Sequence, residues 1–170
     1  LAAVHAARRL AARFRELVVL LGVPPTEPDP ELGYIVLGPQ ITGTPELRQV
    51  EAFIEKPEPA RAREISRAGA LWSTMVACGT ATALWELGRS TSPYLLGVLD
   101  ALVPLIGTEE EDEAIDYIYR ATRPVSFARD VCERGGARVA AMAIPDIDWS
   151  DLGRADRVER VRARHGHAPA

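Results

Sequence analysis

The sequence predicts an α/β protein with a mainly parallel sheet, into which one antiparallel hairpin is inserted. Short apolar runs alternate along the chain with segments of helical periodicity, which is the pattern of a parallel sheet covered by helices. The first apolar run, Leu17 to Leu21, is uninterrupted, as is typical of a strand buried on both faces. The hairpin is predicted because the strand-like segments 33–37 and 46–54 are separated only by a turn rich in glycine and proline.

The other elements follow from periodicity and from capping residues. Thr80, the pair Ser92-Pro93 and the capping box Thr108 to Glu111 each predict the start of a helix. The acidic run 109–113 is interpreted as a solvated helix start, not as a metal site. Periodicity predicts further helices over 1–14, 58–69, 126–134 and 155–164, and further strands over 71–77 and 139–144.

Length and composition indicate one globular domain. A chain of 170 residues with 47% hydrophobic content can bury a core, and we expect the domain to span 1–164, followed by a frayed tail over 165–170. The net charge of −4 argues against a nucleic-acid partner. No apolar run approaches the ~20 residues of a membrane span, so no membrane partner is expected. Two cysteines, Cys78 and Cys132, are too few for a disulfide framework and favour a cytoplasmic location.

The segment Glu55-Lys56-Pro57 carries the strongest chemical signal. It ends an apolar strand with an adjacent acid and base, and we expect the proline to hold Lys56 in an extended conformation. A lysine ammonium can bind a phosphate as a point charge, and a carboxylate can accept hydrogen bonds from hydroxyl groups. The segment therefore predicts a site for a phosphorylated sugar, although by itself it also fits a solvated strand edge.

Two further positions are expected to meet this segment at the carboxyl ends of the strands. Gly33, at the start of a strand, would let the backbone approach a ligand closely, although a turn glycine fits equally. Asp151, in an acid-rich loop before the last helix, can ligate Mg²⁺ or can cap that helix.

Four motifs in order resemble the sugar-1-phosphate nucleotidylyltransferases, and the mannose-1-phosphate guanylyltransferases most of all. They are Gly22-Val23-Pro24-Pro25-Thr26-Glu27-Pro28, Gly33-Tyr34-Ile35, Phe53-Ile54-Glu55-Lys56-Pro57 and Trp149-Ser150-Asp151-Leu152-Gly153. The resemblance runs from about Ala6 to Val158. It implies a Rossmann-like nucleotide-diphospho-sugar transferase fold and the transfer of a nucleotidyl group from an NTP, GTP in the closest relatives, to a sugar 1-phosphate.

The resemblance also implies roles for individual residues. Gly33 and Tyr34 lie in the segment whose glycine backbone contacts the sugar, Glu55 binds the sugar hydroxyls, and Lys56 holds the phosphate as a catalytic residue. Asp151 is a catalytic ligand of Mg²⁺, the implied cofactor. Ser73 lies in the segment Trp72 to Ala77, which matches a substrate-binding strand of the family.

The chain departs from the family pattern in several places. Nothing in it matches the glycine-rich nucleotide loop, so we expect the C-terminal, sugar-recognising part of such an enzyme, with a sheet incomplete at its N-terminal side and an exposed edge at Leu17 to Leu21. Ser73 replaces an asparagine, Met75 a glycine and Ala128 an acid. These changes leave open a non-catalytic sugar-phosphate-binding relative, the identity of the sugar and nucleotide, and whether the protein forms a homo-oligomer.

Overall fold

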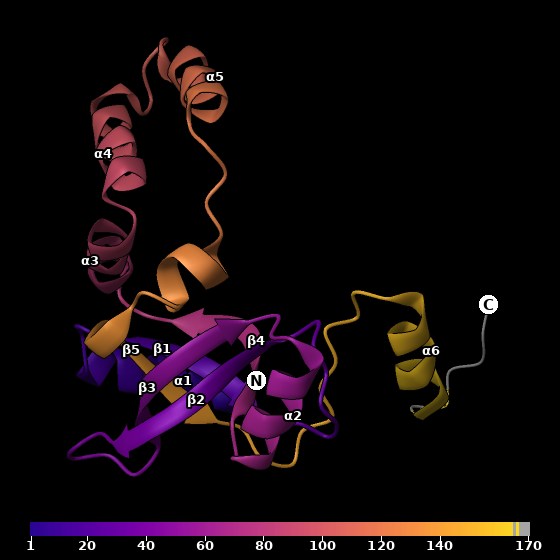
Figure 1. The fold of residues 1–170 in the computed structure, drawn as a ribbon. Coiled ribbons are helices and arrows are strands. Elements are labelled where there is room, and N and C mark those ends of the chain that lie inside the picture. Colours follow the sequence, from indigo (N-terminus) through magenta and orange to yellow (C-terminus); the bar gives the residue numbers. More distant parts are fainter. Residues whose placement is uncertain (165, 167–170) are drawn as a thin grey trace.

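The computed structural model describes residues 1–164 and 166, in which five strands close into a barrel (Figure 1). Neighbouring strands follow the order β1-β4-β2-β3-β5, and β5 pairs back onto β1. The strands are β1 (Val18–Val23), β2 (Gly33–Gln40), β3 (Leu47–Glu55), β4 (Leu71–Cys78) and β5 (Val139–Ala143). The helices are α1 (Ala2–Arg13), α2 (Pro59–Arg67), α3 (Ala81–Thr91), α4 (Pro93–Leu102), η1 (Val103–Leu105), α5 (Glu111–Ala121), η2 (Phe127–Cys132), η3 (Gly136–Arg138) and α6 (Ala155–Arg164).

The predicted mainly parallel, Rossmann-like sheet is wrong, because most strand pairings are antiparallel. Strand β4 pairs antiparallel with β1 and β2, and β3 pairs antiparallel with β2 and β5. Strands β1 and β5 form the one parallel pair within the described residues. An alternation of strands and helices does not distinguish the two arrangements, since it does not say which strands become neighbours. The predicted antiparallel pairing of 33–37 with 46–54 is confirmed, with Gly33 opposite Glu55.

The apolar run in β1 is buried on both faces, as its composition indicates. Val18 and Leu20 belong to one buried cluster, whereas Val19 and Leu21 pack against α1 in another. The expected exposed edge at Leu17 to Leu21 is nevertheless wrong, because β4 pairs along one side of β1 and β5 along the other. Closure of the barrel therefore gives β1 a partner strand on each side, whereas the predicted incomplete sheet would have left one edge of this strand unpaired.

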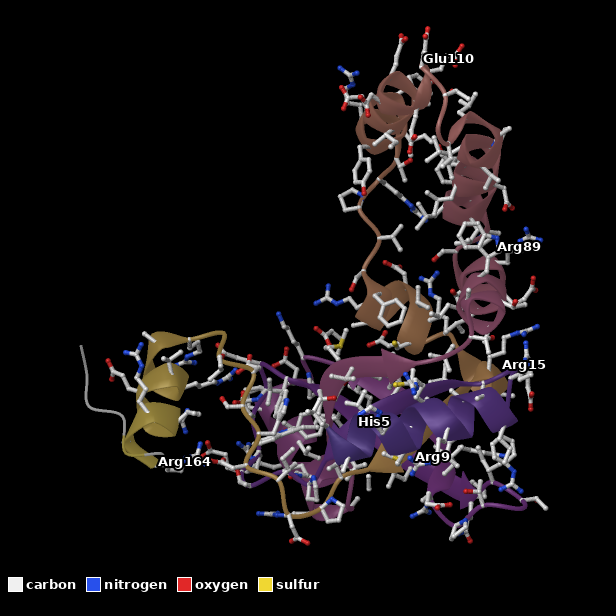
Figure 2. All side chains as sticks on the ribbon, turned by 180° about the vertical axis from the view of Figure 1, so that it is seen from behind. His5, Arg9, Arg15, Arg89, Glu110 and Arg164 are labelled. Atoms are coloured by element: carbon white, nitrogen blue, oxygen red, sulfur yellow. The ribbon has the colours of Figure 1, made fainter. Side chains whose placement is uncertain are left out.

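Helices cover the strands on several sides. Buried residues of α3 and η2, Leu87 and Val131 among them, pack against the strand face that carries Ile35, Phe53 and Leu71. The opposite side of β2 and β4 packs against α2, while α1 covers β1 (Figure 2). The two faces of β2 thus belong to different clusters, as the alternation of side chains along a strand requires.

Helices α3, α4 and α5 form an elongated arm that projects away from the barrel (Figure 1). Leu96 joins α4 to α3, since a Cβ on Gly88 would lie 2.7 Å from Leu96 Cδ2. Leu96 is the one buried residue of α4, and α5 has none among the described residues. Figure 2 places Glu110 at the far end of the arm. Most of the apolar surface of the arm is therefore not covered by the barrel.

The start of α5 differs from the prediction. The hydroxyl of Thr108 donates a hydrogen bond to the Leu105 carbonyl at 2.8 Å, and α5 begins only at Glu111, with no side-chain cap from Glu110. The predicted capping box is therefore wrong, although the acids in the first turn of α5 still face its positive end. The predicted cap at Thr80 is present, since its hydroxyl accepts a hydrogen bond from the Ala83 N–H, and the Ser126 hydroxyl likewise accepts one from the Arg129 N–H.

Two further sequence predictions concern a membrane span and the C-terminal tail. Among the described residues, no helix is both long and apolar enough to cross a membrane. His165 and His167, expected to be solvent-exposed in the tail, lie outside the described residues.

Candidate functional site

Gly33 and Glu55 lie directly opposite each other where β2 begins and β3 ends. A Cβ atom on Gly33 would lie 2.7 Å from Glu55 Oε2 and 3.1 Å from Phe53 Cζ, so the Glu55 carboxylate and the Phe53 ring lie against the buried Gly33. A larger residue here would displace this carboxylate. The structure thus brings together two of the predicted sugar-binding residues.

A second acid, Glu133, joins this pair from the end of η2. The Glu133 Oε1 atom accepts a hydrogen bond of 2.9 Å from the Glu55 backbone N–H. The neighbouring Cys132 is buried, and burial raises the pKa of its thiol to about 12, with further increases from the negative charges of Glu55 and Glu133. The site therefore combines a backbone approach at Gly33 with two carboxylates, on the strand face covered by η2.

Lys56 follows Glu55 and differs from its predicted conformation. Its φ is +49°, in the left-handed region, so the expectation that Pro57 holds it extended is wrong. The chain turns there because β3 ends at Glu55 and α2 begins at Pro59. The Lys56 side chain is exposed and makes no hydrogen bond or ion pair with the described part of the chain. Its ammonium group is therefore available to a ligand beside Glu55.

Ser73 lies near the start of β4, opposite Gly22 of β1, and is buried. Its hydroxyl accepts a hydrogen bond of 3.2 Å from the Met75 N–H and lies 3.6 Å from Met75 Sδ. Met75 has a φ of +56°, a conformation that favours glycine. The hydroxyl of Ser73 thus already interacts with Met75, two residues further along β4.

Tyr34 points to the opposite face of β2 from Gly33. Its side chain is fully buried beside Trp72, and its hydroxyl donates to the Asp29 carbonyl at 3.1 Å and accepts from the Asp29 N–H at 2.8 Å. The side chain therefore holds the proline-rich loop in place, and a contact between Tyr34 and a ligand would have to use the backbone.

Asp151 lies in a different environment from Glu55. Its carboxylate forms an ion pair with Arg157 of α6, a residue whose side chain is only 7% exposed. Arg157 also pairs with Asp29 at 2.7 Å and with Glu31 at 3.0 Å, both in the proline-rich loop. The predicted meeting of Asp151 with Gly33 and Glu55 stays a prediction, and the ion pair of Asp151 within the described residues is with α6.

The charges around Arg157 are matched. Burial alone lowers the pKa of Arg157, but the hydrogen bond to Asp151 and the charges of Asp29, Asp151 and Glu31 raise it overall. A buried guanidinium with three carboxylate partners remains charged.

The arrangement does not form the predicted Mg²⁺ site. Within residues 1–164 and 166, no group of three or more His, Cys, Asp or Glu side chains can hold a metal ion. Asp151, the predicted ligand, is bound to a guanidinium in this conformation. A divalent cation therefore does not fit here unless Arg157 moves.

Comparisons with known proteins find structural relatives only. No family model and no curated protein matches the chain. A mannose-1-phosphate geranyltransferase from Thermus thermophilus superposes with a TM-score of 0.77 and 31% identity, over 94% of this chain and 43% of that one. The structural neighbours are sugar-phosphate enzymes. A second structural neighbour is a mannose-6-phosphate isomerase from Helicobacter pylori. It has a TM-score of 0.67 and 19% identity, over 88% of this chain and 56% of that one, so this likeness shows the fold alone. The chain thus spans less than two thirds of either neighbour.

Sequence reasoning missed the central part that Arg157 plays. Its partners Asp29 and Asp151 lie in separate loops, and Asp29 is 128 residues away in the chain. The signal that was available is the spacing of arginines at 157, 160 and 164 of α6, which places them along one side of the helix.

Proposed function

We propose that this chain binds a sugar 1-phosphate at Gly33, Glu55 and Lys56. The observation that carries the proposal is the position of the Glu55 carboxylate against Gly33, followed in the chain by the exposed Lys56, which has no ion pair with the described residues. Lys56 is the one lysine among the 20 lysine and arginine side chains of the chain. Every other member of this set is an arginine, whereas Lys56 carries a compact ammonium group. Such a group suits the binding of a phosphate as a point charge.

Each of the three residues has a chemical task in this proposal. The Glu55 carboxylate accepts hydrogen bonds from the sugar hydroxyls, Gly33 leaves the room that this carboxylate occupies, and Lys56 neutralises the phosphate. Mannose 1-phosphate is the first ligand to test, because the neighbour of 31% identity is named for it.

The reaction that we propose for the enzyme containing this unit is nucleotidyl transfer. An anionic phosphate oxygen of the sugar 1-phosphate attacks the α-phosphorus of an NTP, with GTP as the first candidate. The bond between the α-phosphorus and the bridging oxygen breaks, and pyrophosphate leaves. The attacking oxygen is already ionised, so no general base is needed, and positioning and charge neutralisation supply the rate. Because the predicted Mg²⁺ site is not formed in this conformation, the proposal rests on the sugar-phosphate residues.

The single lysine makes a direct binding test practical. Reductive methylation with a ¹³C label keeps the charge of Lys56 and gives one side-chain resonance besides that of the N-terminal amine. We expect mannose 1-phosphate to shift the Lys56 resonance. Lys56→Ala should weaken binding, measured by calorimetry, roughly 10- to 100-fold, the loss of one charge-assisted contact.

Arg67→Ala is the matched control, since Arg67 is exposed on the nearby helix α2 and forms no ion pair with the described residues. It should leave the affinity unchanged. Equal affinities for the parent chain and Lys56→Ala, or no shift of the labelled lysine, would rule out the phosphate contact.

A non-catalytic sugar-phosphate-binding protein is the second candidate. It is favoured by Met75, which occupies a left-handed position where the resembled family has glycine, and by Ala128, which replaces an acid. Both candidates bind sugar phosphate, so the test is pyrophosphate release from GTP and mannose 1-phosphate by the longest open reading frame that contains this chain. Release that is lost in Lys56→Ala supports the enzyme, whereas binding without release supports the second candidate.

A further inference from the structure

An apolar groove, the arm groove, runs along one side of α4 and α5. It has a volume of about 530 Å³ and extends from Pro93, at the start of α4, to Leu105 beyond its end. Tyr94 is 60% exposed and Tyr117 is 70% exposed, and both line this groove. A Cβ on Gly97, in the middle of α4, would meet no atom within 4 Å, so the groove is open to a neighbouring chain. A continuous exposed apolar surface of this kind marks an interaction site.

The far end of the arm groove is acidic. Five consecutive acids, residues 109–113, lead into α5, and none of them forms an ion pair with the described part of the chain. Figure 2 shows one of them, Glu110, at the far end of the arm. Glu110 and Glu113 lie four residues before Ala114 and Tyr117, which line the groove, so their side chains border it. We call residues 109–113 the acidic tip.

The end of the arm groove that lies nearer the barrel is basic. Pro93 and Tyr94 line both this groove and a hollow of about 310 Å³, the basic hollow, to which Arg123 and Arg134 contribute. Arg123 is exposed and has no ion pair among the described residues. Arg134 is also exposed, and its one carboxylate partner in that part of the chain, Asp130, lies 3.7 Å away. The basic hollow therefore carries positive charge that one carboxylate does not neutralise.

Opposite charges at the two ends of one apolar groove fit a partner that presents the same features in reverse order. A second copy of this chain, turned end to end, is such a partner. Its acidic tip would meet the basic hollow, and its arm groove would face the arm groove. A parallel arrangement would instead place two acidic tips together, and they would repel each other.

We propose that two copies of this chain associate through their arms, which pack antiparallel about a twofold axis. In such a dimer the same surface of each copy is used, so each contact between tip and hollow occurs twice. The proposal goes beyond sugar-phosphate binding and does not depend on it, because no residue of the arm groove belongs to the site at Gly33, Glu55 and Lys56.

A second apolar hollow on the arm does not have these properties. It is lined by Leu99 and Tyr119 among others, and its lining residues lie between 95 and 99 and between 118 and 125. It therefore does not reach the acidic tip, whereas the arm groove extends to Leu105. Tyr119 is 81% exposed, and it provides a matched control for Tyr117 on the same helix.

Sedimentation velocity of the 170-residue chain over a range of protein concentrations measures the association. We expect a reversible equilibrium between monomer and dimer. Tyr117→Ala should weaken the dimer roughly tenfold, as is typical when an aromatic side chain at the centre of an interface is lost. Tyr119→Ala should leave the association unchanged, because this side chain lies outside the arm groove.

Charge reversal tests the antiparallel arrangement. Glu113→Arg and Arg123→Glu each place like charges where the tip meets the hollow, and each should weaken the dimer about tenfold, since the change occurs twice. The chain with both changes pairs opposite charges again and should recover most of the affinity, as should a mixture of the two single variants. Loss of folding in a single variant would not be rescued in this way. Arg67→Glu, the same charge change on α2, should have no effect.

The other outcomes would overturn the proposal. A parent chain that stays monomeric at every concentration would exclude the dimer. A dimer that responds neither to Tyr117→Ala nor to charge reversal would use another surface. Protection of the α4 and α5 amides from exchange that appears only in the longest open reading frame containing this chain, while that protein is monomeric, would show that another segment covers the groove. Sugar-phosphate binding is decided independently by Lys56→Ala.

Discussion

At the scale of single residues, two positions have an unusual left-handed backbone, and one of them is a departure from the family that the sequence resembles. Met75 stands where that family has glycine, and its φ of +56° shows that the position demands a left-handed backbone. The Met75 side chain is 51% exposed, so the demand comes from the backbone and not from close packing. Lys56 has a left-handed backbone as well, which turns the chain directly after the Glu55 carboxylate.

Met75→Gly should therefore stabilise the protein. Relief of left-handed strain gains about 1–2 kcal/mol, and the greater freedom of glycine in the unfolded chain costs about 0.4–1 kcal/mol, so a net gain of about 0.5–1 kcal/mol is expected. Urea unfolding measures this difference. Met75→Ala retains the strain and should show no gain, and a destabilised Met75→Gly would contradict this account.

Gly33→Ala tests the seat of the Glu55 carboxylate. The added Cβ would meet Glu55 Oε2 at 2.7 Å, so the Glu55 carboxylate would have to move from its present position. We expect mannose 1-phosphate binding to fall at least as far as in Lys56→Ala, with a lower melting temperature. Gly97→Ala is the control, because a Cβ on Gly97 meets no atom within 4 Å. Unchanged binding by Gly33→Ala would show that the carboxylate is not part of the site.

At the scale of elements, η2 links the candidate site to the core. Ala128, Val131 and Cys132 are buried against the strands, and the next residue, Glu133, reaches the backbone of Glu55. The short helix thus anchors one carboxylate of the site through its own packing. The pKa of the buried Cys132 thiol provides a way to measure that packing.

The Cys132 thiol predicts a loss of stability at alkaline pH. Its pKa rises from 9.0 to about 12 on folding, because burial disfavours the thiolate and the charges of Glu55 and Glu133 add to this effect. The unfolded chain therefore releases this proton first, and the free energy of unfolding should fall as pH rises from about 9 towards about 12. Urea unfolding across this range measures the slope. Cys132→Ala should show a shallower dependence, and an identical slope would contradict the assignment.

At the scale of the whole molecule, stability is expected to differ between the barrel and the arm. Strand β1 is paired on both sides and entirely buried, whereas α5 buries no residue within the described part of the chain. Local opening is easiest where few apolar contacts must be broken. The arm and the barrel should therefore behave as separate cooperative units.

Amide hydrogen exchange measures this difference. The amides of α4 and α5 should exchange well before those of β1. Leu96→Ala should speed exchange in α4 by removing its one buried contact, at a cost of about 2–5 kcal/mol, and leave β1 unchanged. Uniform protection of arm and barrel would show that the arm is stabilised by contacts other than those seen.

The sequence alone predicted much of the local structure and the residues of the candidate site. Periodicity placed the helices 1–14 and 155–164, and the turn between 33–37 and 46–54 predicted their antiparallel pairing, because these features depend on residues near each other in the chain. The same pairing brings Gly33 and Glu55 together. What the motif order added was the expectation of a sugar phosphate as their ligand.

Only the tertiary structure decided how distant segments meet. Closure of the barrel depends on β1 pairing with both β4 and β5, and local periodicity carries no information about partners so far apart. The same is true of Arg157, which binds Asp29, 128 residues away in the chain, and pairs with Asp151, the predicted metal ligand. The partners of a charged side chain depend on which segments the fold brings together. The sequence therefore indicated Asp151 as a candidate residue, and only the fold determined that it pairs with Arg157.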